Sequence, residues 1–262
     1  KELFKMALGL MLHKGAELTT REEIKNFPTP EATVNEKTGR GFQPIPHEDL
    51  IGLTEMNLKK FGFEVDEQEY GITPDGNKFF GVMSLKNNEI LGPEDKEFRR
   101  ILGLRNAGDK SFASGLCIGS QVFVCDNMAF SGEITCNHRH TKNILRNLPG
   151  LIYDSISKMG SAFDFQSRRI GKYKNTELTQ EKLSDTVIEL LKGGAINNNQ
   201  VLDVIEEYKK PTVIHSTENK LWNLFNSVTE RHKKLSPVEM CSRTQKLHRV
   251  LDVVANVEPL KF

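Results

Sequence analysis

The spacing of apolar residues changes once along the chain, and this change limits the folds that the chain can adopt. Over residues 63–136 the apolar residues form short runs between turn-forming residues, which is typical of strands. From about residue 138 onward they recur every three or four positions, which is typical of helices packed on a core. The sequence therefore predicts an α+β fold, in which an antiparallel β-meander with a long packing helix is followed by a mainly helical C-terminal half.

Turn and helix-boundary residues place the individual elements. A helix is expected over residues 47–61, because Pro46 stands at its start and Gly62 follows its end. The other predicted elements are a short helix over residues 18–26 capped by Thr19 or Thr20, strands over residues 63–71, 78–85, 99–104 and 116–125, a turn over residues 73–77, a long helix over residues 139–165 interrupted or bent near Pro149 and Gly150, and helices over residues 179–192, 198–208, 217–233 and 242–252.

Three regions follow from this pattern. Residues 1–46 are expected to be an irregular N-terminal region, because prolines and glycines interrupt them. Residues 47–174 are expected to form an α+β core that carries a basic central block. Residues 175–262 are expected to form a helical C-terminal region that packs on the core as one unit.

Composition narrows the class of protein. With 262 residues, of which 37% are hydrophobic and 27% charged, the chain has ample material for a buried core. Its apolar runs stay below the roughly 18 residues of a membrane span, and the acidic Glu2 argues against a signal peptide. Four scattered cysteines are typical of reduced thiols. We expect a cytoplasmic protein of a bacterial host cell without a membrane partner.

The net charge of +1 conceals a separation of charge along the chain. Lys and Arg number 12 against 5 Asp and Glu in residues 99–174, which gives +7, whereas residues 1–98 have 12 against 18, which gives −6. Residues 175–262 have 12 against 12. Phosphate affinity depends on clustered Lys and Arg, so the basic block favours a polyanion site. The alternative is that folding disperses the block over the surface.

The basic block supplies the predicted nucleic-acid-binding residues. Cationic side chains bind phosphates, and aromatic rings between them stack on bases at roughly 1–3 kcal/mol each. On the helix predicted over residues 139–165, Arg139, Lys142 and Arg146 fall on one face. The predicted set is Arg105, Lys110, Arg139, Lys142, Arg146, Arg168, Arg169 and Lys172, with Phe112, Phe130 and Tyr173 nearby in sequence.

Polar residues follow two of the predicted strands at the points where these strands end. Loop residues carried by rigid strands often form binding sites, so we expect a polar site there. The alternative is that Asn-Ala-Gly-Asp and Asp-Asn are ordinary turn formers. The predicted site comprises Asn106, Asp109, Ser111, Asp126, Asn127 and His140.

A cysteine and histidine cluster is an alternative site for zinc, which prefers these ligands. Its spacing counts against zinc, because the sequence has no C-x-x-C. No cofactor is predicted, and the candidate ligands of this weaker alternative are Cys125, Cys136, His138 and His140.

Carboxylates provide two further alternatives. Asp109, Asp126 and Glu133 would bind a divalent ion if the two strand ends adjoin. Asp75 and the later Glu94 and Lys96 match the spacing of a nuclease motif, although Pro-Asp-Gly is better explained as a turn. The sequence contains no phosphate-binding glycine loop and no nucleophile elbow, which argues against ATP, NAD and serine-hydrolase enzymes.

The middle of the chain resembles a known family. The stretch LGLRNAGDKSFASGLCIGSQVFVCDNMAFSGE, followed by RHT, is similar to the core of a family that is found on phages, plasmids and prophages and catalogued as domain of unknown function 932. LMLHKGAEL, QPIPHEDLI, RRIGKY and LWNLFNSVTE fit the same family, so the resemblance spans most of the chain. It implies a mobile genetic element as the setting and brings no established activity with it.

These observations favour a nucleic-acid-binding protein of phage or plasmid origin. An antiparallel meander backed by a long helix is similar to phage single-strand annealing proteins, which form rings or filaments and bind DNA in a basic groove. This likeness is an analogy of fold, and one fold hosts many functions. We expect a non-enzymatic oligomer that binds or anneals single-stranded DNA. The alternatives are a metal-dependent enzyme acting on nucleic acid or nucleotide, and a host-interaction protein with a counter-defence role.

Overall fold

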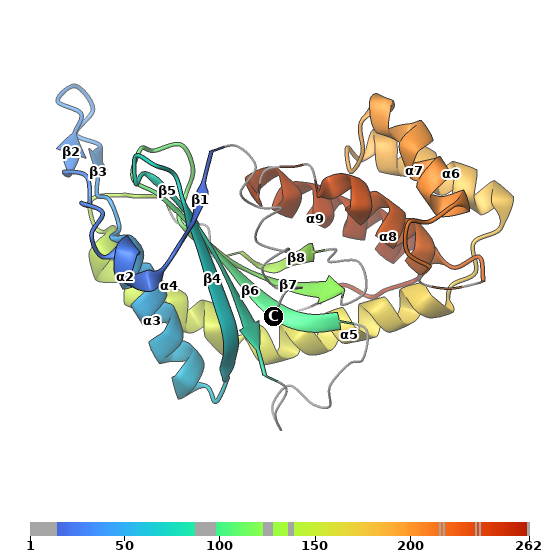
Figure 1. Ribbon diagram of the computed structural model, residues 1–262, viewed down its shortest axis with the longest axis horizontal. Coiled ribbons are helices and arrows are strands. Elements are labelled where there is room, and N and C mark those ends of the chain that lie inside the picture. Colours follow the sequence, from blue (N-terminus) through green and yellow to red (C-terminus); the bar gives the residue numbers. More distant parts are fainter. Residues whose placement is uncertain are drawn as a thin grey trace.

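A six-stranded antiparallel sheet forms the centre of the fold (Figure 1). The computed structural model describes residues 15–86, 98–122, 128–135, 139–214, 216, 218–233, 235 and 237–260. Strands β4 to β8 follow one another as a meander, and β1 adds to the edge beside β4. The strands of this sheet are β1 (Glu17–Thr19), β4 (Val65–Ile72), β5 (Lys78–Leu85), β6 (Phe98–Ala107), β7 (Gly115–Val122) and β8 (Met128–Thr135), and a separate hairpin pairs β2 (Thr33–Val34) with β3 (Gly41–Phe42).

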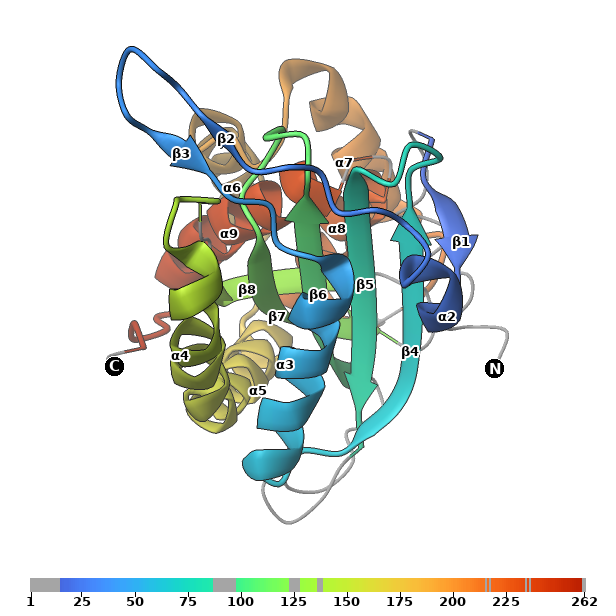
Figure 2. The same cartoon turned by 90° about the vertical axis from the view of Figure 1, so that its left-hand side faces the viewer.

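Helices cover both faces of the sheet and build the C-terminal half. Figure 2 shows α3 and α4 in front of the sheet and α9 behind it. The predicted α+β class, with a meander followed by a mainly helical half, is confirmed. The helices are α2 (Arg21–Ile24), α3 (His47–Lys60), α4 (Ile144–Ser157), α5 (Met159–Asn175), α6 (Gln180–Lys192), the 3-10 helix η1 (Asn198–Gln200), α7 (Val201–Lys209), α8 (Leu221–His232) and α9 (Pro237–Val254).

Alternating residues of the central strands pack into cores on opposite faces of the sheet. Leu102 and Leu104 of β6 belong to a core that they share with α3 and α4. Ile101 of the same strand packs with Met240 of α9 on the opposite face. Successive side chains of a strand point to opposite faces of the sheet, so the continuous apolar run that predicted a buried strand is explained by burial on both sides.

A further core fills the helical half. Tyr173 of α5, Trp222 and Phe225 of α8 and Leu247 of α9 are buried together in it. Met159, at the other end of α5, belongs to the core between the sheet and α3. Helix α5 therefore contributes to both cores.

The break predicted near Pro149 and Gly150 in the long helix over residues 139–165 lies elsewhere. Two helices, α4 and α5, occupy this part of the chain, and α4 continues through Pro149 without a break. The chain turns instead at Lys158, whose backbone N–H donates to the Ser155 carbonyl oxygen at 3.3 Å. This tight turn allows α4 and α5 to place their apolar faces on the same core.

The sequence predicted one helix cap correctly, but the lengths of several elements differ from those predicted. The predicted cap at Thr20 is confirmed, since its hydroxyl accepts from the Glu23 N–H and the Glu23 carboxylate accepts from the Thr20 N–H. The helix it caps spans only one turn, however, and the residues before it form β1 instead of helix. The helices predicted over residues 217–233 and 242–252 correspond to α8 and α9, whose boundaries lie several residues away. Strand β8 was not among the predicted strands.

Candidate functional site

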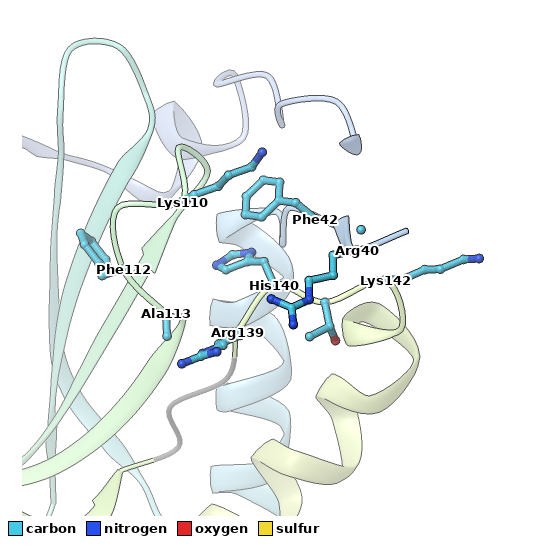
Figure 3. A pocket seen from close by; sticks show the side chains of 10 residues that line it. Arg40, Phe42, Lys110, Phe112, Ala113, Arg139, His140 and Lys142 are labelled. Carbon is cyan, nitrogen blue, oxygen red and sulfur yellow. The ribbon is translucent and has the colours of Figure 1, made fainter. Parts of the chain in front are cut away.

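A basic cleft lies where three segments that are distant in sequence meet. It encloses about 730 Å³. Figure 3 shows the connection between β6 and β7 on one side, and β3 with the segment before α4 on the other. The lining residues are Arg40, Gly41, Phe42, Lys110, Phe112, Ala113, Arg139, His140, Thr141 and Lys142.

Lys110 connects the two sides of the cleft. Its Nζ donates to Thr33 Oγ1 at 3.0 Å and lies 4.8 Å from the centroid of the Phe42 ring. Its backbone has a φ of 68°, a left-handed conformation that costs a residue other than glycine about 1 kcal/mol or more. Asp109 stabilises the turn by accepting a hydrogen bond from the Ser111 N–H at 2.9 Å. A strained cation that lines a cleft is a candidate for function.

His140 is the buried polar residue of the cleft, with 6% of its surface exposed. Its Nδ1 donates to the Gln43 carbonyl oxygen at 3.2 Å, and its ring centroid lies 5.1 Å from that of Phe42. Burial lowers the pKa of His140, so the ring is neutral near pH 7. Because Nδ1 carries the proton, Nε2 keeps a lone pair, and this buried atom has no hydrogen-bond partner among the described residues.

Gly41 lets the hairpin lie directly against the segment before α4. A Cβ atom at this position would stand 3.2 Å from Cβ of Lys142, which is closer than ordinary van der Waals contact. The missing side chain therefore brings the neighbours of Gly41, Arg40 and Phe42, beside the segment that carries Arg139.

The lining of the cleft is positive. None of its ten residues is acidic, and four are cations: Arg40, Lys110, Arg139 and Lys142. Within the described parts of the chain, Arg40, Arg139 and Lys142 form no ion pair with a carboxylate. Cations that no carboxylate neutralises create a local positive potential that attracts a polyanion.

The cleft unites part of the predicted cationic set. Lys110, Arg139 and Lys142 line it, and the Arg105 guanidinium carbon lies 5.8 Å from the centroid of the lining residue Phe112. The three lining cations come from the connection between β6 and β7 and from the segment before α4, so the basic block converges in part on one concave surface.

The predicted helical face of Arg139, Lys142 and Arg146 is wrong. Helix α4 begins at Ile144, so the first two of these residues precede it and are placed by the loop. Three predicted cations are exposed but do not line the cleft: Arg146, Arg168 and Lys172.

Arg169 was predicted to bind nucleic acid, and the structure places it in the interior. Only 4% of its surface is exposed. Its Nε and Nη2 each donate to one carboxylate oxygen of Asp252 at 2.9 Å, and Nη1 donates to Gln166 Oε1 at 2.9 Å. The neighbouring Lys172 is exposed, and its Nζ donates to the Asn256 carbonyl oxygen. Arg169 therefore joins α5 to α9 and is not part of a surface for phosphates.

Arg40 and Phe42 are lining residues that the sequence did not reveal. They lie in a Gly-Arg-Gly-Phe segment between prolines that indicated only an irregular loop. Arg40 also falls in the first 98 residues, whose net charge of −6 concealed it. The available signal was an arginine followed by an aromatic residue in a glycine-containing loop, which is a common composition for a phosphate contact.

The strand-end polar site is only partly assembled. Asn106 is fully buried, and its Nδ2 donates to the Ile45 carbonyl oxygen at 2.7 Å and contacts His47 Nδ1 at 2.8 Å, so it supports the fold instead of facing a ligand. Asp109 and Ser111 form the turn described above, and His140 lines the cleft. The remaining members of this predicted site, Asp126 and Asn127, lie outside the described residues.

The predicted alternatives in which the chain binds a metal ion stay predictions. Three of the zinc candidates, Cys125, Cys136 and His138, lie outside the described residues, as does the side chain of Glu133. Among the residues that the structure describes, no three or more His, Cys, Asp and Glu side chains are grouped to hold a metal ion.

Asp75, the first residue of the candidate nuclease motif, is explained by its role in a turn. Asp75 accepts hydrogen bonds from the Thr73 hydroxyl and from the Asn77 N–H, and these bonds lower its pKa to about 2. Gly76 follows with a φ of 70°, as the predicted turn requires. Its partners in the motif, Glu94 and Lys96, lie outside the described residues.

Comparison with known proteins identifies the family. The model of a family described as a domain of unknown function, DUF932, matches residues 35–253. The chain belongs to the DUF932 family. The match includes every residue that lines the cleft of this DUF932 chain. Neither a curated protein nor a solved structure matches the chain.

Within the described residues, no helix of this DUF932 chain combines the length and the apolar character that crossing a bilayer demands.

Proposed function

We propose that this DUF932 chain binds single-stranded DNA in the basic cleft without catalysing a reaction. The observation that carries the proposal is the lining of the cleft, which combines four cations with two aromatic rings and has no acidic residue. Clustered cations bind phosphates through counterion release, and aromatic side chains stack on bases. The cleft provides both groups within one concave surface.

The aromatic rings favour a single strand over a duplex. Phe42 and Phe112 are partly exposed and lie on opposite sides of the cleft. A base can reach a ring in a cleft only when it is unpaired and splayed from its neighbours, because bases in a duplex are stacked on one another.

Two parts of the hypothesis rest on the sequence alone. Assembly into an oligomer and origin in a phage or plasmid come from the resemblances, and they stay predictions. Analytical ultracentrifugation with and without an oligonucleotide tests the first of them directly.

Salt dependence of binding tests the proposed function. A fluorescently labelled oligothymidylate serves as the probe, and its anisotropy reports binding. Four phosphate contacts predict a slope of log K against log salt of about −3, which corresponds to about fifty-fold weaker binding at 200 mM than at 50 mM salt. A matched duplex is expected to bind more weakly. A flat salt response, or no binding at 50 mM salt, would refute the proposal.

Replacing Lys110 by asparagine separates binding from folding. Asparagine tolerates the left-handed backbone at φ 68° better than lysine does, so we expect a thermal midpoint within about 2 °C of the wild-type value. Loss of one phosphate contact should weaken oligonucleotide binding about five-fold at 0.1 M salt. Arg168→Asn, on the exposed surface of α5, is the matched control and should bind like the wild type. Equal losses in both variants would contradict a role of the cleft.

A further inference from the structure

Two cysteines meet where α9 packs on the sheet. Cys117 of β7 is 7% exposed and belongs to the small core between the sheet and α9, together with Val82, Ile101 and Met240. Cys241 of α9 is half-buried and packs against the same core. Both thiols are reduced. Figure 1 shows α9 lying over the part of the sheet that β7 and β8 form.

The surroundings of Cys241 favour the thiolate form of its side chain. A hydrogen bond with the Cys117 thiol lowers the pKa of Cys241, and the positive charge of Arg105 lowers it further, against an opposing effect of burial. The thiolate is the reactive form of cysteine. Because Cys241 is more exposed than Cys117, an oxidant in solution meets Cys241 first.

We propose that Cys241 and Cys117 are an oxidisable thiol pair that a peroxide converts into a disulfide between α9 and β7. The Cys241 thiolate attacks one oxygen of the peroxide, the O–O bond breaks, and the leaving oxygen takes up a proton. This leaves a sulfenic acid on Cys241. Cys117 then attacks that sulfur, the S–S bond forms, the S–O bond breaks, and the hydroxide leaves with a proton as water. With hydrogen peroxide, the two thiols lose two electrons and the peroxide becomes two molecules of water.

The disulfide would connect two elements that are distant in sequence. The crosslink would close a loop on the order of 100 residues, which restricts the unfolded chain strongly. Oxidation is therefore expected to raise the thermal midpoint by about 10 °C, an increase that a reductant reverses. This inference does not depend on the ligand of the cleft.

Peptide mapping of the full chain tests the pairing. The reduced wild-type protein is treated with hydrogen peroxide in slight excess, blocked with iodoacetamide, digested and analysed by mass spectrometry without a reductant. The expected product is one crosslinked pair of peptides that contain Cys117 and Cys241, and dithiothreitol should separate them. A crosslink that involves Cys125 or Cys136 instead, or no crosslink at a peroxide dose that oxidises Cys241, would overturn the proposal.

Single variants test the order of the two steps. In Cys117→Ser the reaction should stop at the sulfenic acid of Cys241, which dimedone labels. In Cys241→Ser no label should appear on Cys117. Dimedone labelling of Cys117 in the second variant would show that the order is wrong, and an unlabelled Cys241 in the first would show that it is not the peroxide-reactive thiol. If a variant does not fold, peptide mapping of the wild-type chain still decides the pairing.

Discussion

The double variant Arg40→Glu, Arg139→Glu is expected to bind a single-stranded oligonucleotide about twenty-five-fold more weakly than the wild type at 0.1 M salt. Each cation that contacts a phosphate contributes about 0.7 to the slope of log K against log salt, which amounts to about a factor of five per contact at this salt concentration. The slope should therefore fall by about 1.4. Both residues line the cleft, are exposed and form no ion pair with described residues, so the thermal midpoint should not change.

A matched control separates the cleft from the total charge. Arg168→Glu, Lys182→Glu changes the net charge by the same amount at two exposed positions, one on α5 and one on α6, that do not line the cleft. We expect this control to bind within about two-fold of the wild type, because charges beyond a Debye length of about 10 Å are screened at 0.1 M salt. Fluorescence anisotropy titrations at several salt concentrations measure both quantities. If both variants lose the same affinity, binding follows net charge and the cleft is not the site.

The fold class could be predicted from the sequence because the patterns that indicate it are local. The apolar run around Ile101 and Leu102 predicted a buried strand, and burial of these two residues on opposite faces of the sheet is the reason. The predicted turn at Gly76 and the predicted cap at Thr20 each depend on a few neighbouring residues. Strand β8 was missed since its polar residues and its glycine interrupt the apolar pattern.

The sequence predicted only part of the cleft, because the segments that form its walls are distant in sequence. Arg139 and Lys142 were predicted from the basic block, whereas Arg40 lies about one hundred positions earlier in an acidic region. Contact between β3 and the segment before α4 depends on Gly41, and no local pattern predicts which segment a glycine in a loop will touch. Counting charges in blocks of sequence therefore identified Lys110, Arg139 and Lys142 and missed Arg40 of the hairpin.

The periodicity of α5 contains the signal that would have excluded Arg169. Its buried residues recur at spacings of three and four, from Phe163 and Gln166 to Arg169, Ile170 and Tyr173. Arg169 thus falls on the apolar face, where a buried arginine requires an acidic partner. Treating it as one more member of a basic cluster ignored its position on the helix.

Removing the Arg169 side chain is expected to destabilise the fold by about 3–5 kcal/mol, because it leaves a buried charge without its partner. Arg169 is 4% exposed and Asp252 is 19% exposed, and two hydrogen bonds of 2.9 Å join them. In Arg169→Ala the Asp252 carboxylate keeps the hydrogen bond from the Tyr173 hydroxyl, at 2.6 Å, but loses its cation. Urea unfolding followed by circular dichroism should show a lower midpoint with an unchanged slope.

Two further variants identify the cause of that loss. Arg168→Ala changes the adjacent but exposed residue and should alter stability by less than about 0.5 kcal/mol. Arg169→Met combined with Asp252→Leu removes both charges and should recover much of the lost stability, since an apolar pair avoids the cost of burying ions. If Arg169→Ala instead folds with wild-type stability and binds the oligonucleotide weakly, its guanidinium acts at the surface, and the buried pair between α5 and α9 does not exist in solution.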